Sequence, residues 1–160
     1  MKPKKSWREK LADSKDLPKI GDFKTRNTKK WGDGLGVIPA PLEVDALMKK
    51  VPRGKLVTIT ELRSALASRH KVAFACPITT GIFAWIAAHA ANEAEEEGRK
   101  RITPYWRTLK TGGEVNGKYP GGSDNVARRL KAEGHRVVQK GKRLLVADYE
   151  KKLFNELPDK

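Results

Sequence analysis

Apolar residues recur at helical spacing in several stretches of this chain, separated by proline and glycine. The first helix is predicted to begin at Pro41, with acidic residues early and lysines late, as the helix dipole favours. Its apolar positions are Leu42, Val44, Leu47, Met48 and Val51. Residues 52–55 end this helix, because they contain a proline and a glycine.

Two more helices are predicted in the middle of the chain. Residues 57–59 are β-like, and Thr60 is expected to cap a helix from Glu61 to Ala67. Pro77 and Thr79 open the next helix, whose apolar face is Ile82, Phe83, Ile86 and Ala90. Residues 92–101 are expected to be a polar connection. Their acidic run should form a solvated helix end, since like charges at that density favour water.

The C-terminal third predicts one further helix and a hairpin. Ser123 or Asp124 is expected to cap a helix that runs to Ala132. Two strand-like runs, 135–138 and 143–146, lie on either side of a Lys-Gly-Lys turn and indicate a β-hairpin. Residues 149–157 are expected to form a short terminal helix.

The N-terminal arm, residues 1–36, shows little periodicity. Ser6 is placed to cap a short helix that contains Trp7 and Leu11. Residues 31–34 indicate a turn. Three aromatic residues are expected to anchor the arm on the rest of the protein: Trp7, Phe23 and Trp31.

The predicted order is helix, short strand, helix, helix, loop, helix and hairpin. Two helices joined by a turn, together with a basic hairpin, are typical of a winged helix-turn-helix. We therefore predict a fold that is mainly α with small β elements. The winged helix-turn-helix domain is expected to cover residues 39–160, and residues 1–38 form a basic N-terminal arm that is partly docked or flexible.

The charge of the chain indicates what kind of partner it meets. Its 160 residues include 34 Lys and Arg against 19 Asp and Glu, a formal net charge of +15. The excess comes from residues 1–30, with 11 basic and 4 acidic side chains, and from residues 101–160, with 14 and 7. Such an excess favours a polyanion, most simply nucleic acid. A merely solvated basic surface is the plainer alternative.

Cysteine and histidine content limits the chemistry. Cys76 is the one cysteine, so no intrachain disulfide and no cysteine-rich zinc site can form. Three scattered histidines add no ligand pattern, and we expect neither metal nor cofactor. No apolar segment follows the N-terminal lysines, and the longest apolar run is too short to span a bilayer. We therefore expect no membrane association and a cytoplasmic protein, located at the nucleoid when bound to DNA.

Two short motifs carry the candidate chemistry, Thr103-Pro104-Tyr105-Trp106-Arg107 and Asn116-Gly117-Lys118-Tyr119-Pro120-Gly121-Gly122. Together with residues 51–58 and 130–134, they resemble four motifs of the O6-alkylguanine-DNA alkyltransferase superfamily, the methylated-DNA-protein-cysteine methyltransferase family, in the same order. The resemblance covers residues 42–146 and the family's C-terminal DNA-binding domain. It is closer to the alkyltransferase-like proteins, which recognise alkylated bases without repairing them.

The resemblance implies binding without alkyl transfer. Tyr105 stands where the family has its acceptor cysteine, and Trp106 stands where it has the activating histidine. A phenol with an ordinary pKa of about 10 does not replace an activated thiolate, so we expect no enzyme activity. The resemblance implies instead that the protein recognises alkylated guanine in double-stranded DNA by base flipping. We expect it to act as a monomer and to signal to DNA repair, specifically to nucleotide excision repair proteins.

We expect three sets of binding residues. The lesion pocket comprises Tyr105, Trp106, Arg107, Tyr119, Gly121 and Gly122. The recognition helix presents Thr79, Thr80, Gly81, Ala84 and Trp85. Phosphate contacts are expected from Thr58, Lys110, Lys118, Arg128, Arg129, Lys140, Lys142 and Arg143. A core position is the alternative for Trp106, and a structural hydrogen-bond network is the alternative for Arg107 and Glu133.

The chain departs from the family pattern in ways that keep other functions open. Ile59 replaces the tyrosine with which the family rotates a phosphate, and no arginine stands near Thr80 or Gly81 to fill the vacated stack. One alternative is therefore a general nucleic-acid-binding module or regulator without lesion specificity. A second is a vestigial transferase that uses Cys76, and a third is an adaptor that binds proteins through the N-terminal arm.

Overall fold

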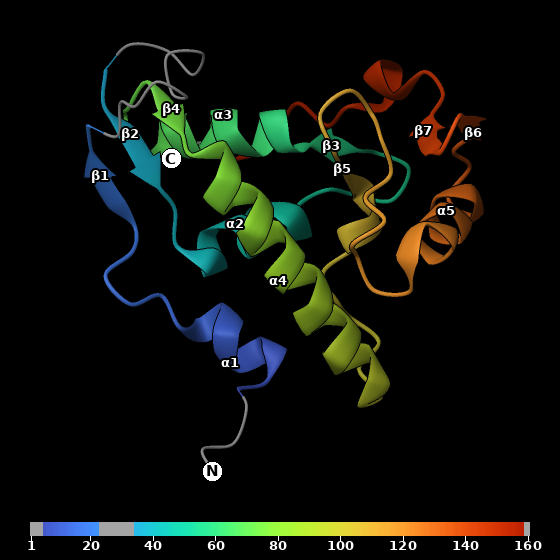
Figure 1. The fold of residues 1–160 in the computed structure, drawn as a ribbon, viewed down its shortest axis with the longest axis horizontal. Helices are drawn as coiled ribbons and strands as arrows, with labels where there is room; N and C mark the ends of the chain where they lie inside the picture. Colours follow the sequence, from blue (N-terminus) through green and yellow to red (C-terminus); the bar gives the residue numbers. More distant parts are fainter. Residues whose placement is uncertain (1–4, 23–33, 159–160) are drawn as a thin grey trace.

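One long helix lies at the centre of the molecule (Figure 1). The computed structural model describes residues 5–22 and 34–158, and this helix, α4, spans Pro77–Glu96. Three helices pack against it: α1 (Trp7–Ala12), α2 (Pro41–Lys49) and α3 (Ile59–Arg69). The packing is close because α4 turns small side chains inward, among them the buried Ala84, Ala87, Ala88 and Ala91.

The strands form three small sheets, so the described residues make a mixed α/β fold. The first sheet has the order β1-β2-β4 (Lys19–Gly21, Gly36–Ile38, Phe74–Ala75), antiparallel and then parallel. In the second, β3 (Val57–Thr58) pairs in parallel with β5 (Thr108–Leu109). The third is the antiparallel hairpin of β6 (Val137–Lys140) and β7 (Arg143–Val146). The predicted hairpin is confirmed, with its first strand two residues later than expected.

Helix α3 begins two residues before the predicted start. Thr58, and not Thr60, is its cap: the Thr58 hydroxyl accepts from the Thr60 amide at 3.1 Å. The Thr58 amide in turn donates to a carboxylate oxygen of Glu61 at 2.6 Å. The two residues therefore form a reciprocal capping box, which fixes this helix start more firmly than one side chain would.

The other helix boundaries differ from the predictions in a similar way. Helix α4 continues through the acidic run to Glu96, where a polar connection was expected from residue 92. Helix α5 spans Gly122–Ala132 and starts after Gly121 at φ 78°, so neither Ser123 nor Asp124 is its cap. Of the predicted terminal helix at 149–157, only a short 3₁₀ turn at Tyr149–Lys152 forms.

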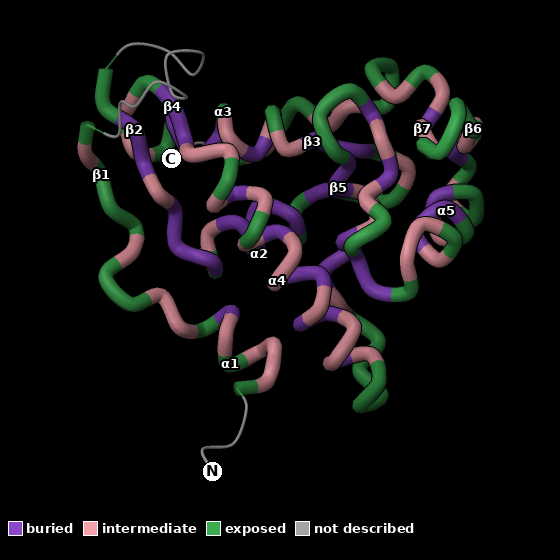
Figure 2. The backbone as a smooth tube through the Cα atoms, viewed as in Figure 1, coloured by how far each residue is buried: buried purple, intermediate pink, exposed green. Residues whose placement is uncertain are grey.

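The described part of the arm packs against the rest of the protein. Leu11 and Val37 are buried in the same core as Leu47, and Figure 2 shows buried positions along β2. Ser6 caps α1 as predicted, accepting from the Glu9 amide at 3.1 Å. The proposed anchors Phe23 and Trp31 lie outside the described residues, as does the turn predicted at 31–34 except for Gly34. No helix among the described residues is long and apolar enough to cross a membrane.

Helices α3 and α4 are consecutive, and the β6–β7 hairpin follows a further helix, α5. This is the element order on which the winged helix-turn-helix prediction rests. Strand β4 lies in the connection between α3 and α4 and pairs with β2 from the N-terminal segment. The segment before α2 therefore helps to set the orientation of α4. Assignment to the winged helix-turn-helix class stays a prediction.

Candidate nucleic-acid interface

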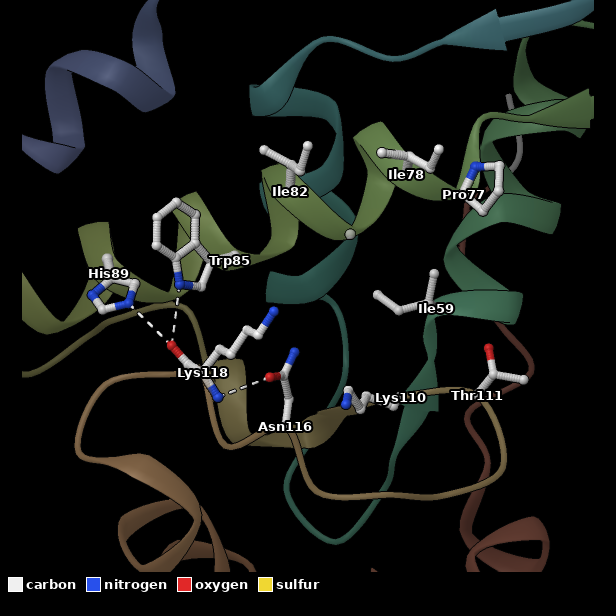
Figure 3. A pocket seen from close by; sticks show the side chains of 11 residues that line it. Ile59, Pro77, Ile78, Ile82, Trp85, His89, Lys110, Thr111, Asn116 and Lys118 are labelled. Atoms are coloured by element: carbon white, nitrogen blue, oxygen red, sulfur yellow. Dashed lines mark hydrogen bonds between the residues drawn. The ribbon is translucent and has the colours of Figure 1, made fainter. Parts of the chain in front are cut away.

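A cavity of about 860 Å³ opens between the first half of α4, the start of α3 and the loop 110–118 (Figure 3). We call it the α3–α4 groove. Eleven residues line it: Ile59, Pro77, Ile78, Gly81, Ile82, Trp85, His89, Lys110, Thr111, Asn116 and Lys118. Its volume lies within the roughly 300–1,000 Å³ that is usual for small-molecule sites.

The α4 side of the groove is apolar and open. Ile78 and Ile82 are 63% and 45% exposed, which is unusual for large aliphatic side chains one turn apart on a helix. Between them, a Cβ placed on Gly81 would meet no heavy atom within 4 Å. An approaching ligand can therefore reach the α4 backbone at Gly81, where no side chain intervenes.

The loop side of the groove is polar and positively charged. Lys110 and Lys118 are both exposed. The Glu114 carboxylate lies 3.9 Å from the Lys110 Nζ, a weak pair at the surface. Thr111 lies 3.2 Å from the Thr60 hydroxyl, oxygen to oxygen. The groove thus combines an apolar wall with a cationic rim.

The loop is attached to α4 at one point. The Lys118 carbonyl accepts from Trp85 Nε1 at 3.1 Å, and His89 Nε2 lies 3.3 Å from the same oxygen (Figure 3). The Lys118 amide donates to Asn116 Oδ1 at 3.0 Å. These contacts fix the backbone of the loop, while the Lys118 side chain stays free to meet an anion.

The predicted lesion-pocket aromatics come together, and two of the three are closed off from solvent. Tyr105 lies edge-on to Trp106 and to Tyr119, with ring centroids 5.2 and 5.9 Å apart. Tyr105 is 0% and Tyr119 2% exposed, so in this structure their rings belong to the core and do not line the α3–α4 groove. Burial raises the pKa of both phenols, which keeps them neutral.

Trp106, Arg107 and Glu133 form one hydrogen-bonded network. Glu133 accepts from Arg107 Nη2 at 2.7 Å and from Trp106 Nε1 at 3.0 Å. Arg107 Nη1 also donates to the Val51 carbonyl at 2.8 Å. Burial alone would raise the pKa of Glu133, but the hydrogen bonds from Arg107 and Trp106 outweigh it and lower that pKa. Arg107 and Glu133 therefore belong to a hydrogen-bond network of the kind considered as the alternative to a binding role.

The glycine-rich loop is shaped by a residue that the sequence motifs did not mark. Gly121 and Gly122 have φ values of 78° and 75°, a region that side chains disfavour. Asn125 Nδ2 donates to the Pro120 carbonyl at 2.9 Å and to the Tyr105 hydroxyl at 3.1 Å. A Cβ on Gly121 would lie 2.6 Å from the Asn125 Cβ, so glycine is required there.

Two of the predicted recognition-helix residues face the core of the protein and not the solvent. Thr80 and Ala84 are each 0% exposed, and the Thr80 hydroxyl donates to the Cys76 carbonyl at 2.7 Å. Helical periodicity turns them toward the core. The other three, Thr79, Gly81 and Trp85, are partly exposed, and Gly81 and Trp85 line the groove.

The predicted phosphate-binding residues also differ in their exposure. Thr58 is 3% exposed and caps α3, and Arg129 is half-buried and paired with Glu95, so neither is free to bind a phosphate. The remaining six are exposed: Lys110, Lys118, Arg128, Lys140, Lys142 and Arg143. Lys110 and Lys118 line the groove, and the last three lie on the β6–β7 hairpin.

Comparison with known proteins gives little guidance. No family model and no curated protein matches the sequence. One solved structure with a related shape is S. pombe Atl1 in complex with damaged DNA containing O6-carboxymethylguanine. The TM-score is 0.47 and the sequence identity 16%, over 71% of this chain and 93% of that one. A likeness this distant assigns neither a family nor a function.

Part of the groove carries no signal in the sequence. The sequence pattern placed Ile82 on the apolar face of the helix, and it assigned no role to Ile78, Thr111 or Asn116. The exposure of Ile78 and Ile82 depends on what α4 packs against, which periodicity does not specify. His89 packs against Trp7 and Trp85, with ring centroids 4.4 and 5.2 Å away.

Proposed function

We propose that this protein binds duplex DNA through the α3–α4 groove and recognises alkylated guanine without chemically changing it. In this proposal the damaged base leaves the helix and enters the groove, while the exposed lysines and arginines contact phosphates. The observation that carries the proposal is the pairing of an exposed apolar α4 face with a cationic rim around a cavity of about 860 Å³.

Charge and shape support DNA as the partner. The chain carries a net charge of +15, and polyanion binding gains from the counterions that each neutralised phosphate releases. Exposed apolar side chains flanked by lysines suit a nucleic acid whose bases are partly unstacked, because such side chains can be inserted between base steps.

The chemistry of the groove supports a preference for an alkylated base. An alkyl group adds apolar surface to the edge of guanine, and Ile59, Ile78 and Ile82 offer apolar surface in return. Extruding a base costs a few kcal/mol, and less when its pairing is already weakened by damage. Both effects favour the damaged base over the normal one.

The residues around Tyr105 support DNA binding without alkyl transfer. Tyr105 is buried, its pKa is raised, and its hydroxyl accepts a hydrogen bond from the side-chain amide of Asn125. Glu133, which would have to act as a base, is engaged by Arg107 and Trp106. We further propose a cytoplasmic monomer that hands the lesion to nucleotide excision repair proteins.

The test is binding of the full chain to two duplexes that differ in one base, guanine or O6-methylguanine, at matched salt. We expect tighter binding to the alkylated duplex, with 2-aminopurine opposite or beside the lesion reporting extrusion. Equal affinities for the two duplexes would overturn lesion recognition.

A general nucleic-acid-binding function without lesion preference is the second candidate. It is favoured by Ile59, which cannot hydrogen-bond a phosphate, and by the closed packing of Tyr105 and Tyr119. It predicts the equal affinities just described. The vestigial transferase is tested in the same experiment with labelled alkyl groups, because transfer to Cys76 would label the protein.

A further inference from the structure

Three aromatic side chains from two distant parts of the chain meet beside the α3–α4 groove. Trp7 of α1 stacks on His89 with ring centroids 4.4 Å apart and an interplanar angle of 23°. It also lies edge-on to Trp85 at 4.8 Å and 86°. Trp85 and His89 are the two α4 residues that contact the Lys118 carbonyl.

Helix α1 is attached to α4 by a carboxylate. Glu93 accepts the backbone amides of Trp7 and Arg8 at 3.1 and 3.3 Å, and Arg8 Nε at 3.0 Å. Arg8 also pairs with Glu97. A helix of six residues is not stable alone in water, so α1 depends on this docking, which at the same time places the Trp7 ring against His89.

We infer that α1 holds the loop 116–119 in place against α4, a role that we call the brace, and that Trp7 is a positioning residue for Lys118. The chain of contacts runs from Trp7 through the Trp85 and His89 rings to the Lys118 carbonyl. With Trp7 in place, both rings are packed on two sides and direct their nitrogens at this oxygen. Without it, they gain rotamer freedom and the loop loses its attachment to α4.

This inference rests on the proposed function for one step only, the contact between Lys118 and a phosphate. The brace itself is a statement about the loop 116–119. A purely structural role for α1, in which it only covers the apolar side of α4, predicts lower stability for a Trp7 variant without any specific effect on Lys118.

A double-mutant cycle in the full chain separates these roles. The variants are Trp7→Ala, Lys118→Ala and the double variant, with Trp7→Phe as the conservative replacement that keeps a ring on His89. Binding to an undamaged duplex is measured over a range of salt concentrations. Lys118→Ala should reduce the salt slope by about one phosphate contact, Trp7→Ala should reduce it by a similar amount, and the double variant should show no further fall.

Lys140 on the hairpin provides the matched comparison, since it is an exposed lysine outside the groove. The effects of Trp7→Ala and Lys140→Ala should add, because distant sites act independently. Trp7→Phe should bind nearly as the native protein does. Additive effects of Trp7→Ala and Lys118→Ala, or an unchanged salt slope in Trp7→Ala, would overturn the inference.

If the native protein binds no duplex, the proposed function fails, but the brace can still be tested. The measurement is then hydrogen exchange at the backbone amides of the loop. Trp7→Ala should speed exchange of the Lys118 and Tyr119 amides, which are bonded to Asn116. Lys140→Ala should leave these amides unchanged. Unchanged exchange at both amides in Trp7→Ala would refute the brace, whatever the outcome of the DNA measurements.

Discussion

Arg107 and Glu133 form a two-point ion pair in which Arg107 Nη2 and Nε lie 2.7 and 2.9 Å from the two carboxylate oxygens of Glu133. The side chains are only 14% and 4% exposed. The pair connects the turn at 105–107 to the end of α5, and Arg107 also reaches the Val51 carbonyl after α2. One arginine therefore joins three segments that are distant in the sequence.

Arg107→Ala is predicted to destabilise the protein strongly. It leaves Glu133 buried without its cation, and breaking a buried pair costs about 3–5 kcal/mol. Urea denaturation measures the change in the free energy of unfolding. Arg143→Ala is the control, because its pair with Glu114 is 58% and 21% exposed and is expected to contribute no more than about 1 kcal/mol. Similar losses in both variants would contradict the structural role of Glu133.

The Glu133 carboxyl should make stability depend on acid pH. Its pKa in the folded protein is lower than its ordinary value of 4.5, so the folded state favours the ionised form. The resulting stability is fully present above pH 4.5, and it is lost as the pH falls through the lower folded pKa. Glu133→Gln should remove this part of the pH dependence.

Thermal denaturation of the native protein and Glu133→Gln, from pH 6 down to pH 2.5 or so, measures the difference. Glu93 also has a lowered pKa and contributes to the same window in both proteins. The difference between the two curves therefore reports Glu133, together with the change in the pKa of His135, which burial lowers and the Glu133 charge raises. Parallel curves throughout would show that Glu133 is not ionised preferentially in the folded state.

Two glycine substitutions should act in opposite directions. In Gly36→Ala the new Cβ would lie 2.4 Å from the Phe74 ring, across the β2–β4 pair, and overpacking of this kind costs about 1–3 kcal/mol. In Gly81→Ala the new methyl group meets open space on a helix, where alanine is better than glycine by roughly 0.5–1 kcal/mol. Chemical denaturation compares the two variants.

Gly81→Ala should also weaken DNA binding while it raises stability. The proposed interface uses the bare α4 backbone at Gly81, and the methyl group would hold a nucleic acid away from it. A fluorescence anisotropy titration with a duplex measures the loss. A variant that is more stable and binds DNA as well as the native protein would show that nothing approaches α4 closely at this position.

The parts of the fold that could be predicted from the sequence are those marked by local signals. Pro41 and the residues 52–55 bound α2 because proline and glycine act within their own turn. The hairpin could be predicted because its turn and both strands follow one another directly in the sequence. The start of α3 was misplaced although Thr58 and Glu61 carry a capping-box signal, since Thr60 offered a competing cap.

The parts that could not be predicted depend on partners far along the chain. The acidic run was interpreted as a solvated helix end, but Glu93 binds Arg8 and Glu95 binds Arg129, which lets α4 continue to Glu96. Tyr105 was expected to form a pocket wall. Whether an aromatic residue lines a cavity or fills the core depends on the neighbouring elements, here Asn125 and Tyr119.

The exposed face of α4 offers the sharpest test of the interface. Ile82→Ser removes apolar surface from a side chain that is 45% exposed, so the free energy of unfolding should change by no more than about 0.5 kcal/mol. DNA affinity should nevertheless fall, because Ile82 lines the groove. Leu42→Ser on α2 is the matched control: Leu42 is 49% exposed and lies outside the groove.

We expect Leu42→Ser to bind duplex DNA as the native protein does, and Ile82→Ser to bind it more weakly at every salt concentration with an unchanged salt slope. The slope should not change because Ile82 carries no charge and releases no counterion. Anisotropy titrations at three salt concentrations measure both quantities. Equal affinities of the two variants would place the DNA on another face, with the hairpin lysines as the next surface to examine.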